Sequence, residues 1–184
     1  MKSNNAYPKK EIIMNKLVEL WRTTANRWLY LSGALVVTLM FCSALYLQYV
    51  LRQDPCPLCM IQRVIFISIG ITFFIAALHN PERIASKVYS GIIIVFAITG
   101  LSVAGRQIWM QHLPKDQVPS CGPGLDFMLN NFPLSEVLQE LLHGSGECAV
   151  KGWTFLTLGI PEWSFLSFII LGTWALLLAF RKVD

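Results

Sequence analysis

The chain has 184 residues, of which 54% are hydrophobic and only 14% are charged, and its mean hydropathy is +0.52. An average soluble domain carries about 25% charged residues, so this composition excludes an ordinary water-soluble protein and favours a single membrane domain over 1–184. The net charge of +4 does not indicate nucleic-acid binding, because the positions of the basic residues have a simpler explanation.

Four long apolar segments predict four transmembrane helices, at 28–51, 60–79, 88–109 and 163–180. The first has 24 residues without a charge. At a rise of about 1.5 Å per residue it would be about 36 Å long, enough to cross a hydrocarbon layer of about 30 Å. It is too long for the apolar core of a signal peptide, so we expect a retained helix. The predicted fold class is all-α: a polytopic membrane protein with a four-helix transmembrane bundle.

Basic residues are concentrated on one side of this predicted bundle. Ten of the fifteen lie in the N-terminal tail 1–27, in 80–87 or in 181–182, whereas the loops 52–59 and 110–162 hold seven of the eleven acidic residues. By the positive-inside rule, both termini are expected in the cytoplasm and the two loops on the outer side.

The predicted 110–162 loop is too long to be a simple connection. Apolar residues recur at helical spacing from Leu134 to Leu142, and polar residues fill the opposite face. This pattern predicts a short amphipathic helix that lies flat on the outer membrane surface.

A Cys-x-x-Cys pair stands where the first loop meets the second span. Asp54 and Pro55 predict an N-cap and a first helical residue, which would place Cys56 and Cys59 at the helix N-terminus. The helix dipole there stabilises a thiolate, which suits thiol–disulfide exchange. Arg63 follows Cys59 by four residues and is predicted to stabilise its thiolate from the same helix face. The alternative is a structural arginine that extends toward the lipid headgroups.

Of the five cysteines, Cys121 and Cys148 lie in the long outer loop. On the oxidising side of a membrane they are expected to form a disulfide. This bond could be a static clamp worth about 3–4 kcal/mol, or a disulfide offered to the thiol of a partner. A zinc site is disfavoured, because only one cysteine pair is closely spaced. Cys42, in the middle of the first span, is predicted to be a packing residue.

Two cysteine pairs on one side of a membrane suggest an electron relay. The chain has neither a Gly-x-Gly-x-x-Gly fingerprint nor a Cys-x-x-Cys-His haem motif, so the predicted acceptor is a lipid-soluble quinone. Arg106 and His112, near the outer end of the third span, are candidates to hold quinone oxygens or to transfer protons. A headgroup-facing arginine and a solvent-exposed histidine are the alternatives.

Several motifs together resemble the DsbB family of bacterial inner-membrane disulfide-forming enzymes, over nearly all of 28–180. These motifs are Pro55-Cys56-Pro57-Leu58-Cys59 with Arg63, Gly105-Arg106-Gln107-Ile108-Trp109, Pro119-Ser120-Cys121-Gly122-Pro123-Gly124-Leu125-Asp126, Cys148-Ala149 with Trp153, and Gly159-Ile160-Pro161-Glu162-Trp163.

The resemblance implies a multi-pass protein of the bacterial inner (cytoplasmic) membrane with periplasmic redox loops. It would reoxidise a periplasmic DsbA-like protein and reduce ubiquinone or menaquinone, with no metal and no nucleic acid involved. The DsbA thiolate would attack Cys121 of a Cys121–Cys148 disulfide. The released Cys148 would attack Cys56, which would free Cys59 as a thiolate beside the quinone, stabilised by Arg63. Two alternatives are the same chemistry for a dedicated DsbA-like partner, and a non-catalytic membrane subunit whose disulfides brace its loop.

Overall fold

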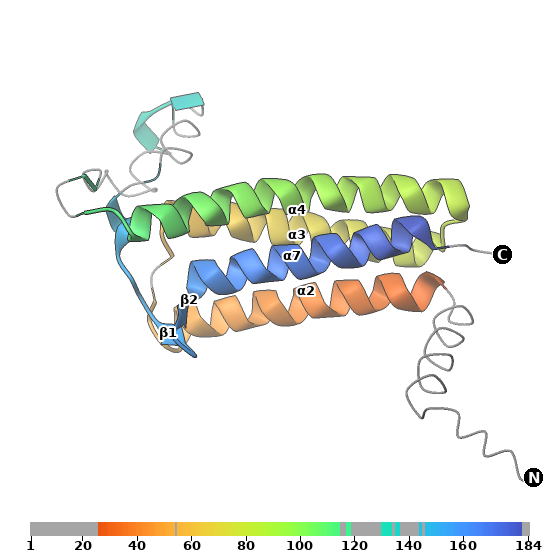
Figure 1. The fold of residues 1–184 in the computed structure, drawn as a ribbon, viewed down its shortest axis with the longest axis horizontal. Coiled ribbons are helices and arrows are strands. Elements are labelled where there is room, and N and C mark those ends of the chain that lie inside the picture. The colour runs from red at the N-terminus through yellow and green to blue at the C-terminus, as the bar shows by residue number, and fades with distance from the viewer. Residues whose placement is uncertain are drawn as a thin grey trace, which may run out of the picture.

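The structure is a computed structural model that describes residues 26–53, 55–114, 117–118, 130–133, 135–136, 144 and 146–181. Most of the amphipathic helix predicted between Leu134 and Leu142 lies outside these residues. Four long helices form a bundle (Figure 1): α2 (Asn26–Tyr49), α3 (Pro57–His79), α4 (Arg83–Gln111) and α7 (Ile160–Phe180). Between α4 and α7 lie a short 3-10 helix and two short antiparallel strands: η1 (Gly146–Ala149), β1 (Thr154–Phe155) and β2 (Leu158–Gly159).

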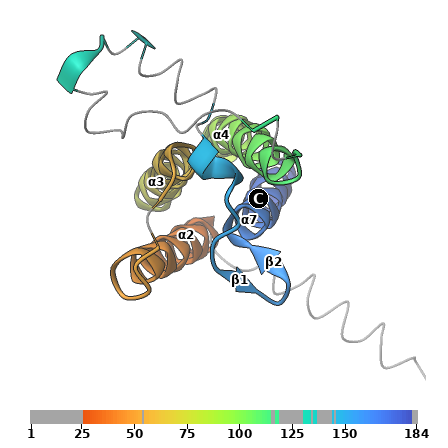
Figure 2. The same cartoon turned by 90° about the vertical axis from the view of Figure 1, so that its left-hand side faces the viewer.

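Each long helix packs against the one that precedes it among these four. The pairs α2 with α3, α3 with α4, and α4 with α7 share the extensive contacts, whereas α2 and α7 make few direct contacts. Seen end-on, the four helices form a ring, and η1 and the β1–β2 hairpin lie across one end of it (Figure 2). We call this end, at which α3 and α7 begin, the thiol end.

All four helices are long and apolar enough to cross a membrane. Large apolar side chains also cover the outside of the bundle, including Leu35, Val64 and Val95, which are 60%, 63% and 63% exposed. A helix that is apolar all round belongs in lipid or in the core of a large protein, and no part of the chain that the structure describes covers these outer faces. The predicted four-helix membrane fold is therefore confirmed.

The start of α3 corrects one prediction. Cys56, with φ −70° and ψ 163°, is the N-cap, and Pro57 is the first helical residue. A proline disfavours helical backbone in the residue before it, so Pro57 keeps Cys56 extended and the helix cannot begin earlier. The predicted N-cap at Asp54 is therefore wrong, and Asp54 itself lies outside the described residues.

The hairpin before α7 was not predicted. Its two turn residues, Leu156 and Thr157, have φ values of 51° and 70°. Such a turn usually carries asparagine, aspartate or glycine, because branched side chains resist positive φ. The sequence therefore contains no recognisable signal for this turn.

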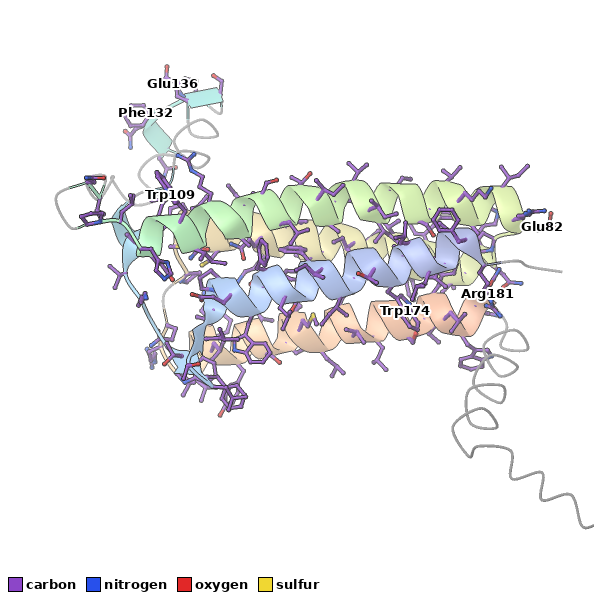
Figure 3. All side chains as sticks on the ribbon, viewed as in Figure 1. Glu82, Trp109, Phe132, Glu136, Trp174 and Arg181 are labelled. Carbon is purple, nitrogen blue, oxygen red and sulfur yellow. The ribbon has the colours of Figure 1, made fainter. Side chains whose placement is uncertain are left out.

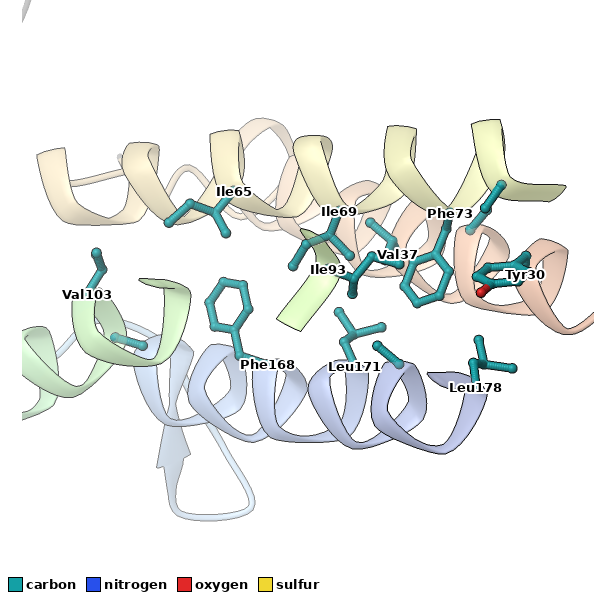
Figure 4. Packing of buried hydrophobic residues seen from close by; sticks show 14 of the residues in the cluster. Tyr30, Val37, Ile65, Ile69, Phe73, Ile93, Val103, Phe168, Leu171 and Leu178 are labelled. Atoms are coloured by element: carbon teal, nitrogen blue, oxygen red, sulfur yellow. The ribbon is translucent and has the colours of Figure 1, made fainter. Parts of the chain in front are cut away.

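Two glycines leave room for aromatic rings in the core, because a side chain at either position would overlap a ring. A Cβ on Gly33 would lie 2.7 Å from the ring of Phe73, and one on Gly100 would lie 2.4 Å from the ring of Phe168. Both rings point into the centre of the bundle (Figure 4). Gly100 thus lets α4 and α7 approach closely, as small residues do in membrane helices. Gly91 has nothing within 4 Å of a built Cβ, so it has no such role.

Polar contacts join α2 to α7 at the end opposite the thiol end. Trp174 donates from Nε1 to the carbonyl oxygen of Leu29 at 3.4 Å, and Arg181 donates to Asn26 Oδ1 at 2.8 Å. Figure 3 shows Trp174 and Arg181 in this half of the bundle, far from Trp109 at the thiol end. These contacts close the seam between α2 and α7 at this end.

Candidate active site

The Cys-x-x-Cys pair occupies the first turn of α3. Cys56 is the N-cap and Cys59 is the third helical residue, and their sulfur atoms lie 3.0 Å apart. The N–H of Met60 donates to the carbonyl oxygen of Cys56 at 3.1 Å, which closes this turn around the pair. Both sulfurs therefore lie at the positive end of the helix dipole, where a thiolate is stabilised.

A third thiol reaches this pair from the long loop. Cys148, in η1, is only 1% exposed, and its thiol hydrogen-bonds with that of Cys56. Gly144 helps to seat this segment on α3 and α4. It has φ +77°, and a Cβ there would lie 2.9 Å from Met110 and 3.0 Å from Leu58. The fold thus brings together two cysteines that are far apart in the sequence.

The surroundings of Cys56 disfavour its thiolate. The hydrogen bond with Cys148, the hydrogen bond with Cys59 and burial all raise the pKa of Cys56. Cys56 is therefore expected to stay protonated at neutral pH whenever all three thiols are reduced.

Two buried glutamines complete the thiol site, and the sequence analysis missed their role. Gln107 in α4 donates from Nε2 to the sulfurs of Cys59 and Cys56, at 3.2 and 3.3 Å. Gln62 in α3 donates from Nε2 to Gln107 Oε1 at 2.7 Å. Each glutamine is 3% exposed. Uncharged polar residues inside an otherwise apolar span are a signal of function that could have identified both.

Arg63 lies one helical turn beyond Cys59, and its guanidinium reaches across to α2. It donates to Gln48 Oε1, and its second terminal nitrogen donates to the carbonyl oxygen of Ala44 at 3.3 Å. Arg63 therefore supplies a fixed positive charge near the pair, whereas Gln107 makes the direct hydrogen bond to Cys59.

A cavity of about 950 Å³ lies beside the thiols. It occupies the seam between α2 and α7, and its floor includes Cys59, Gln62, Arg63 and Gln107. Its remaining walls are mainly apolar and come from α2, α3, the start of α7, and the hairpin with the residues just before it. They include Leu39, Leu47, Phe66, Trp153 and Trp163.

Glu162 adds an acidic group to the α7 side of this cavity. Its Oε2 atom is buried and has no hydrogen-bond partner among the residues that the structure describes. The carboxylate lies in the first turn of α7, where the helix dipole favours a negative charge.

The other predicted site residues are placed differently. Arg106 and His112 are exposed, and neither is among the residues that line the cavity. His112 donates from Nδ1 to the carbonyl oxygen of Ile108 at 2.8 Å, within its own helix. Cys121 lies outside the described residues. Cys42 is exposed and lines the cavity, so its predicted role as a buried packing residue is wrong.

These features define a polytopic membrane protein with a site suited to thiol–disulfide exchange. The family model for the disulfide bond formation protein DsbB matches residues 26–178, and the chain belongs to this family.

Similar curated proteins carry the same description. "Disulfide bond formation protein B" of Nitrosococcus oceani is 48% identical over 146 residues, which are 79% of this chain and 86% of that protein. The protein of the same name from Hahella chejuensis is 49% identical over 149 residues, or 81% and 89% of the two chains. "Disulfide bond formation protein B 1" of Pseudomonas aeruginosa is 41% identical over 143 residues, or 78% and 88%.

Proposed function

We propose that this chain reoxidises a periplasmic DsbA-like thiol oxidase and passes the electrons to a membrane quinone. The observation that carries this proposal is the meeting of Cys56, Cys59 and Cys148 beside a cavity of about 950 Å³ in the apolar part of the bundle. Membership of the DsbB family and the names of the relatives support a role in disulfide bond formation.

The proposed exchange starts at the Cys121–Cys148 disulfide. A thiolate of the reduced partner attacks Cys121, which breaks that bond and releases Cys148 with the electron pair. The second thiol of the partner then displaces Cys121, so the partner leaves as a disulfide. Two electrons have now entered the chain.

The second exchange transfers these electrons to the Cys56–Cys59 pair. Cys148 attacks Cys56, a Cys56–Cys148 bond forms, the Cys56–Cys59 bond breaks, and Cys59 leaves as a thiolate. Cys121 then attacks Cys148, which re-forms the Cys121–Cys148 bond, breaks the Cys56–Cys148 bond and releases Cys56, so both electrons end on Cys56 and Cys59. The hydrogen bond between Cys148 and Cys56 supports this step, because it places the attacking and attacked sulfurs together. A static clamp between Cys121 and Cys148 would not require that contact, so it favours exchange over a purely structural disulfide.

The cavity fits a quinone of the ubiquinone or menaquinone type. A bound quinone would accept two electrons and two protons and become a quinol. Arg63, Gln62 and Gln107 are polar groups on the wall beside Cys59 that could orient its ring oxygens, and the apolar walls suit its ring and tail. A contact from Arg106 or His112 would need a ligand that extends beyond this cavity.

The orientation we propose places the thiol end at the periplasmic face of the bacterial inner membrane and both termini in the cytoplasm. The basic residues of 1–27, 80–87 and 181–182 support it through the positive-inside rule. The periplasm is oxidising, so disulfides persist there and can take part in thiol–disulfide exchange.

The test is a quinone-reduction assay with the purified full-length protein, a reduced DsbA-like protein and ubiquinone. We expect the partner to be oxidised and quinol to form in equal amounts. Cys59→Ala and Cys121→Ala should each abolish turnover, whereas Thr99→Val, on the outer face of α4, should not. A wild-type protein that leaves the partner reduced would refute the proposal.

The alternative is that the same chemistry serves a dedicated DsbA-like partner, so that only the protein substrate differs. Complementation of a strain that lacks its general disulfide-forming membrane enzyme distinguishes a general partner from a dedicated one. Rescue of general disulfide formation supports a broad DsbA-like partner, and failure of an expressed, quinone-active protein supports a dedicated one.

A further inference from the structure

We propose that Gln107 is a catalytic residue that stabilises the Cys59 thiolate by hydrogen bonding, and that Gln62 is the positioning residue that fixes the direction of the Gln107 amide. The proposal rests on the exchange function of the Cys56–Cys59 pair, and it gives a role in the exchange steps to two side chains that have so far been placed only in the cavity wall.

The first observation is the position of Gln107. Its amide nitrogen lies 3.2 Å from Cys59 Sγ and 3.3 Å from Cys56 Sγ, so the two N–H groups of one amide can reach both sulfurs. Gln107 comes from α4, whereas both cysteines belong to the first turn of α3. The contact therefore depends on the packing of two helices and does not arise from local sequence.

The second observation is the direction of the amide. Gln107 Oε1 accepts a hydrogen bond of 2.7 Å from Gln62 Nε2. If the Gln107 amide were reversed, its oxygen would face the sulfurs and two amide nitrogens would face each other. With the Gln62 amide oriented as it is in the structure, this hydrogen bond keeps Gln107 Nε2 closest to the sulfurs, while Gln107 Oε1 lies 3.6 Å from Cys59 Sγ.

The third observation is burial. Both glutamines are 3% exposed and lie in helices that cross the membrane. Burying an amide is costly unless it is hydrogen-bonded, so two amides at this depth need a compensating role. A hydrogen bond to an ionised acceptor is roughly twice as strong as one between neutral groups. The Gln107 donor therefore favours the thiolate over the disulfide sulfur.

The Gln107 donor acts in the step that breaks the Cys56–Cys59 bond. When Cys148 bonds to Cys56, the Cys56–Cys59 bond breaks and Cys59 leaves with the electron pair. A donor already aimed at Cys59 stabilises this leaving group without rearrangement, as fixed dipoles do in other active sites. It also makes the Cys56–Cys59 disulfide easier to reduce.

The experiment measures the equilibrium of this pair with glutathione. The full-length protein carries Cys121→Ser and Cys148→Ser, so that only Cys56 and Cys59 exchange, and the reduced fraction is read by alkylation and gel shift. Gln107→Met keeps the side-chain length but removes the donor. We expect it to shift the equilibrium constant toward the disulfide by about tenfold, the effect of losing one charge-assisted hydrogen bond.

Gln62 is tested through a double-mutant cycle. Gln62→Met should shift the equilibrium in the same direction by a smaller factor, and the double variant should match Gln107→Met alone, because Gln62 acts only through Gln107. Thr99→Val, an exposed position on the same helix as Gln107, should leave the equilibrium unchanged. If Gln107→Met does not fold, Gln107→Asn withdraws the same amide by one methylene and should shift the equilibrium in the same direction.

A Gln107 variant that is folded and has the wild-type equilibrium overturns the catalytic role. Additive effects of the two methionine variants overturn the positioning role of Gln62. Since glutathione replaces both the partner protein and the quinone, this result is independent of the quinone-reduction assay. Failure of the proposed function and failure of this inference can therefore be distinguished.

Discussion

The three thiols that meet at the start of α3 have unequal environments, and the proposed relay depends on this difference. Both Cys56 and Cys59 line the cavity, but Cys56 contacts both other thiols and is 8% exposed, whereas Cys59 is half-buried. Cys56 can therefore exchange with Cys148 on one side while Cys59 faces a different reactant on the other.

The raised pKa of Cys56 leads to a prediction about its alkylation in the fully reduced protein. Hydrogen bonding with Cys148 is the first cause of the shift, followed by Cys59 and burial. A higher pKa lowers the thiolate fraction at a given pH, so Cys56 should react with iodoacetamide at pH 7 at least about tenfold more slowly than an unfolded cysteine. Its rate should still rise at pH 9 to 10, where that of an unfolded cysteine levels off.

Peptide mass spectrometry measures each cysteine separately, and urea-unfolded protein is the control. Cys148→Ala removes the first cause and should accelerate the alkylation of Cys56 at pH 7. A rate for Cys56 that levels off near pH 8.5 would show that burial alone, and not a raised pKa, slows the reaction.

The sequence predicts part of this site because part of it is local. Cys56, Cys59 and Arg63 belong to one short motif, and helix geometry relates them without knowledge of the fold. Gln107 and Cys148 reach the pair from other elements. The family resemblance predicts that Cys148 meets Cys56, whereas only the packing of α3 against α4 reveals the contact of Gln107. A polar residue in an apolar span indicates a function, but it does not identify its partner.

Among the elements, the packing of α4 against α7 depends on Gly100. Gly100→Ala would place a Cβ about where the Phe168 ring now lies, at 2.4 Å. We expect a loss of about 1–3 kcal/mol in stability, since overpacking forces backbone shifts or unfavourable rotamers. Thermal unfolding in detergent, followed by circular dichroism, measures the effect. Gly91→Ala is the matched control, because nothing lies within 4 Å of its built Cβ. Equal melting temperatures for the two variants would contradict this account.

The seating of η1 depends on Gly144. Its φ of +77° disfavours any other residue, and an added methyl group would meet Met110 and Leu58. Gly144→Ala is therefore expected to move Cys148 away from Cys56 and to slow Cys56–Cys148 disulfide formation about tenfold or more. Non-reducing peptide mapping after rapid acid quenching measures this rate. The glutathione equilibrium of the Cys56–Cys59 pair should stay unchanged, and a parallel change in both would indicate general disruption of α3.

The long helices could be predicted because their apolar runs are continuous, but their ends depend on other interactions. α4 begins at Arg83, five residues before the predicted span, because a helix can continue beyond the membrane with charged residues such as Arg83 and Lys87. The hairpin could not be predicted, because Leu156 and Thr157 take their positive φ values from the surrounding structure and not from their own preference.

At the scale of the whole molecule, the two ends of the bundle differ in chemistry. One end holds the thiols and the cavity, and the other holds the short α3–α4 turn and the contact between Arg181 and Asn26. Electrons that enter at the thiol end therefore need not cross the membrane, since the proposed donor and acceptor both reach the same end.

The orientation that we propose can be tested with introduced cysteines on a background in which the native cysteines are serine. Lys151 is exposed beside the thiol site, and Lys87 is exposed at the opposite end. Because ten of the fifteen basic residues fall in 1–27, 80–87 or 181–182 of the sequence, the positive-inside rule favours a cytoplasmic position for Lys87. A membrane-impermeant maleimide should therefore label Lys151→Cys in intact spheroplasts and should label Lys87→Cys only after permeabilisation. Labelling of Lys87→Cys in intact spheroplasts would contradict this orientation. It would indicate that the thiol end faces the reducing cytoplasm, where a disulfide relay would not be sustained.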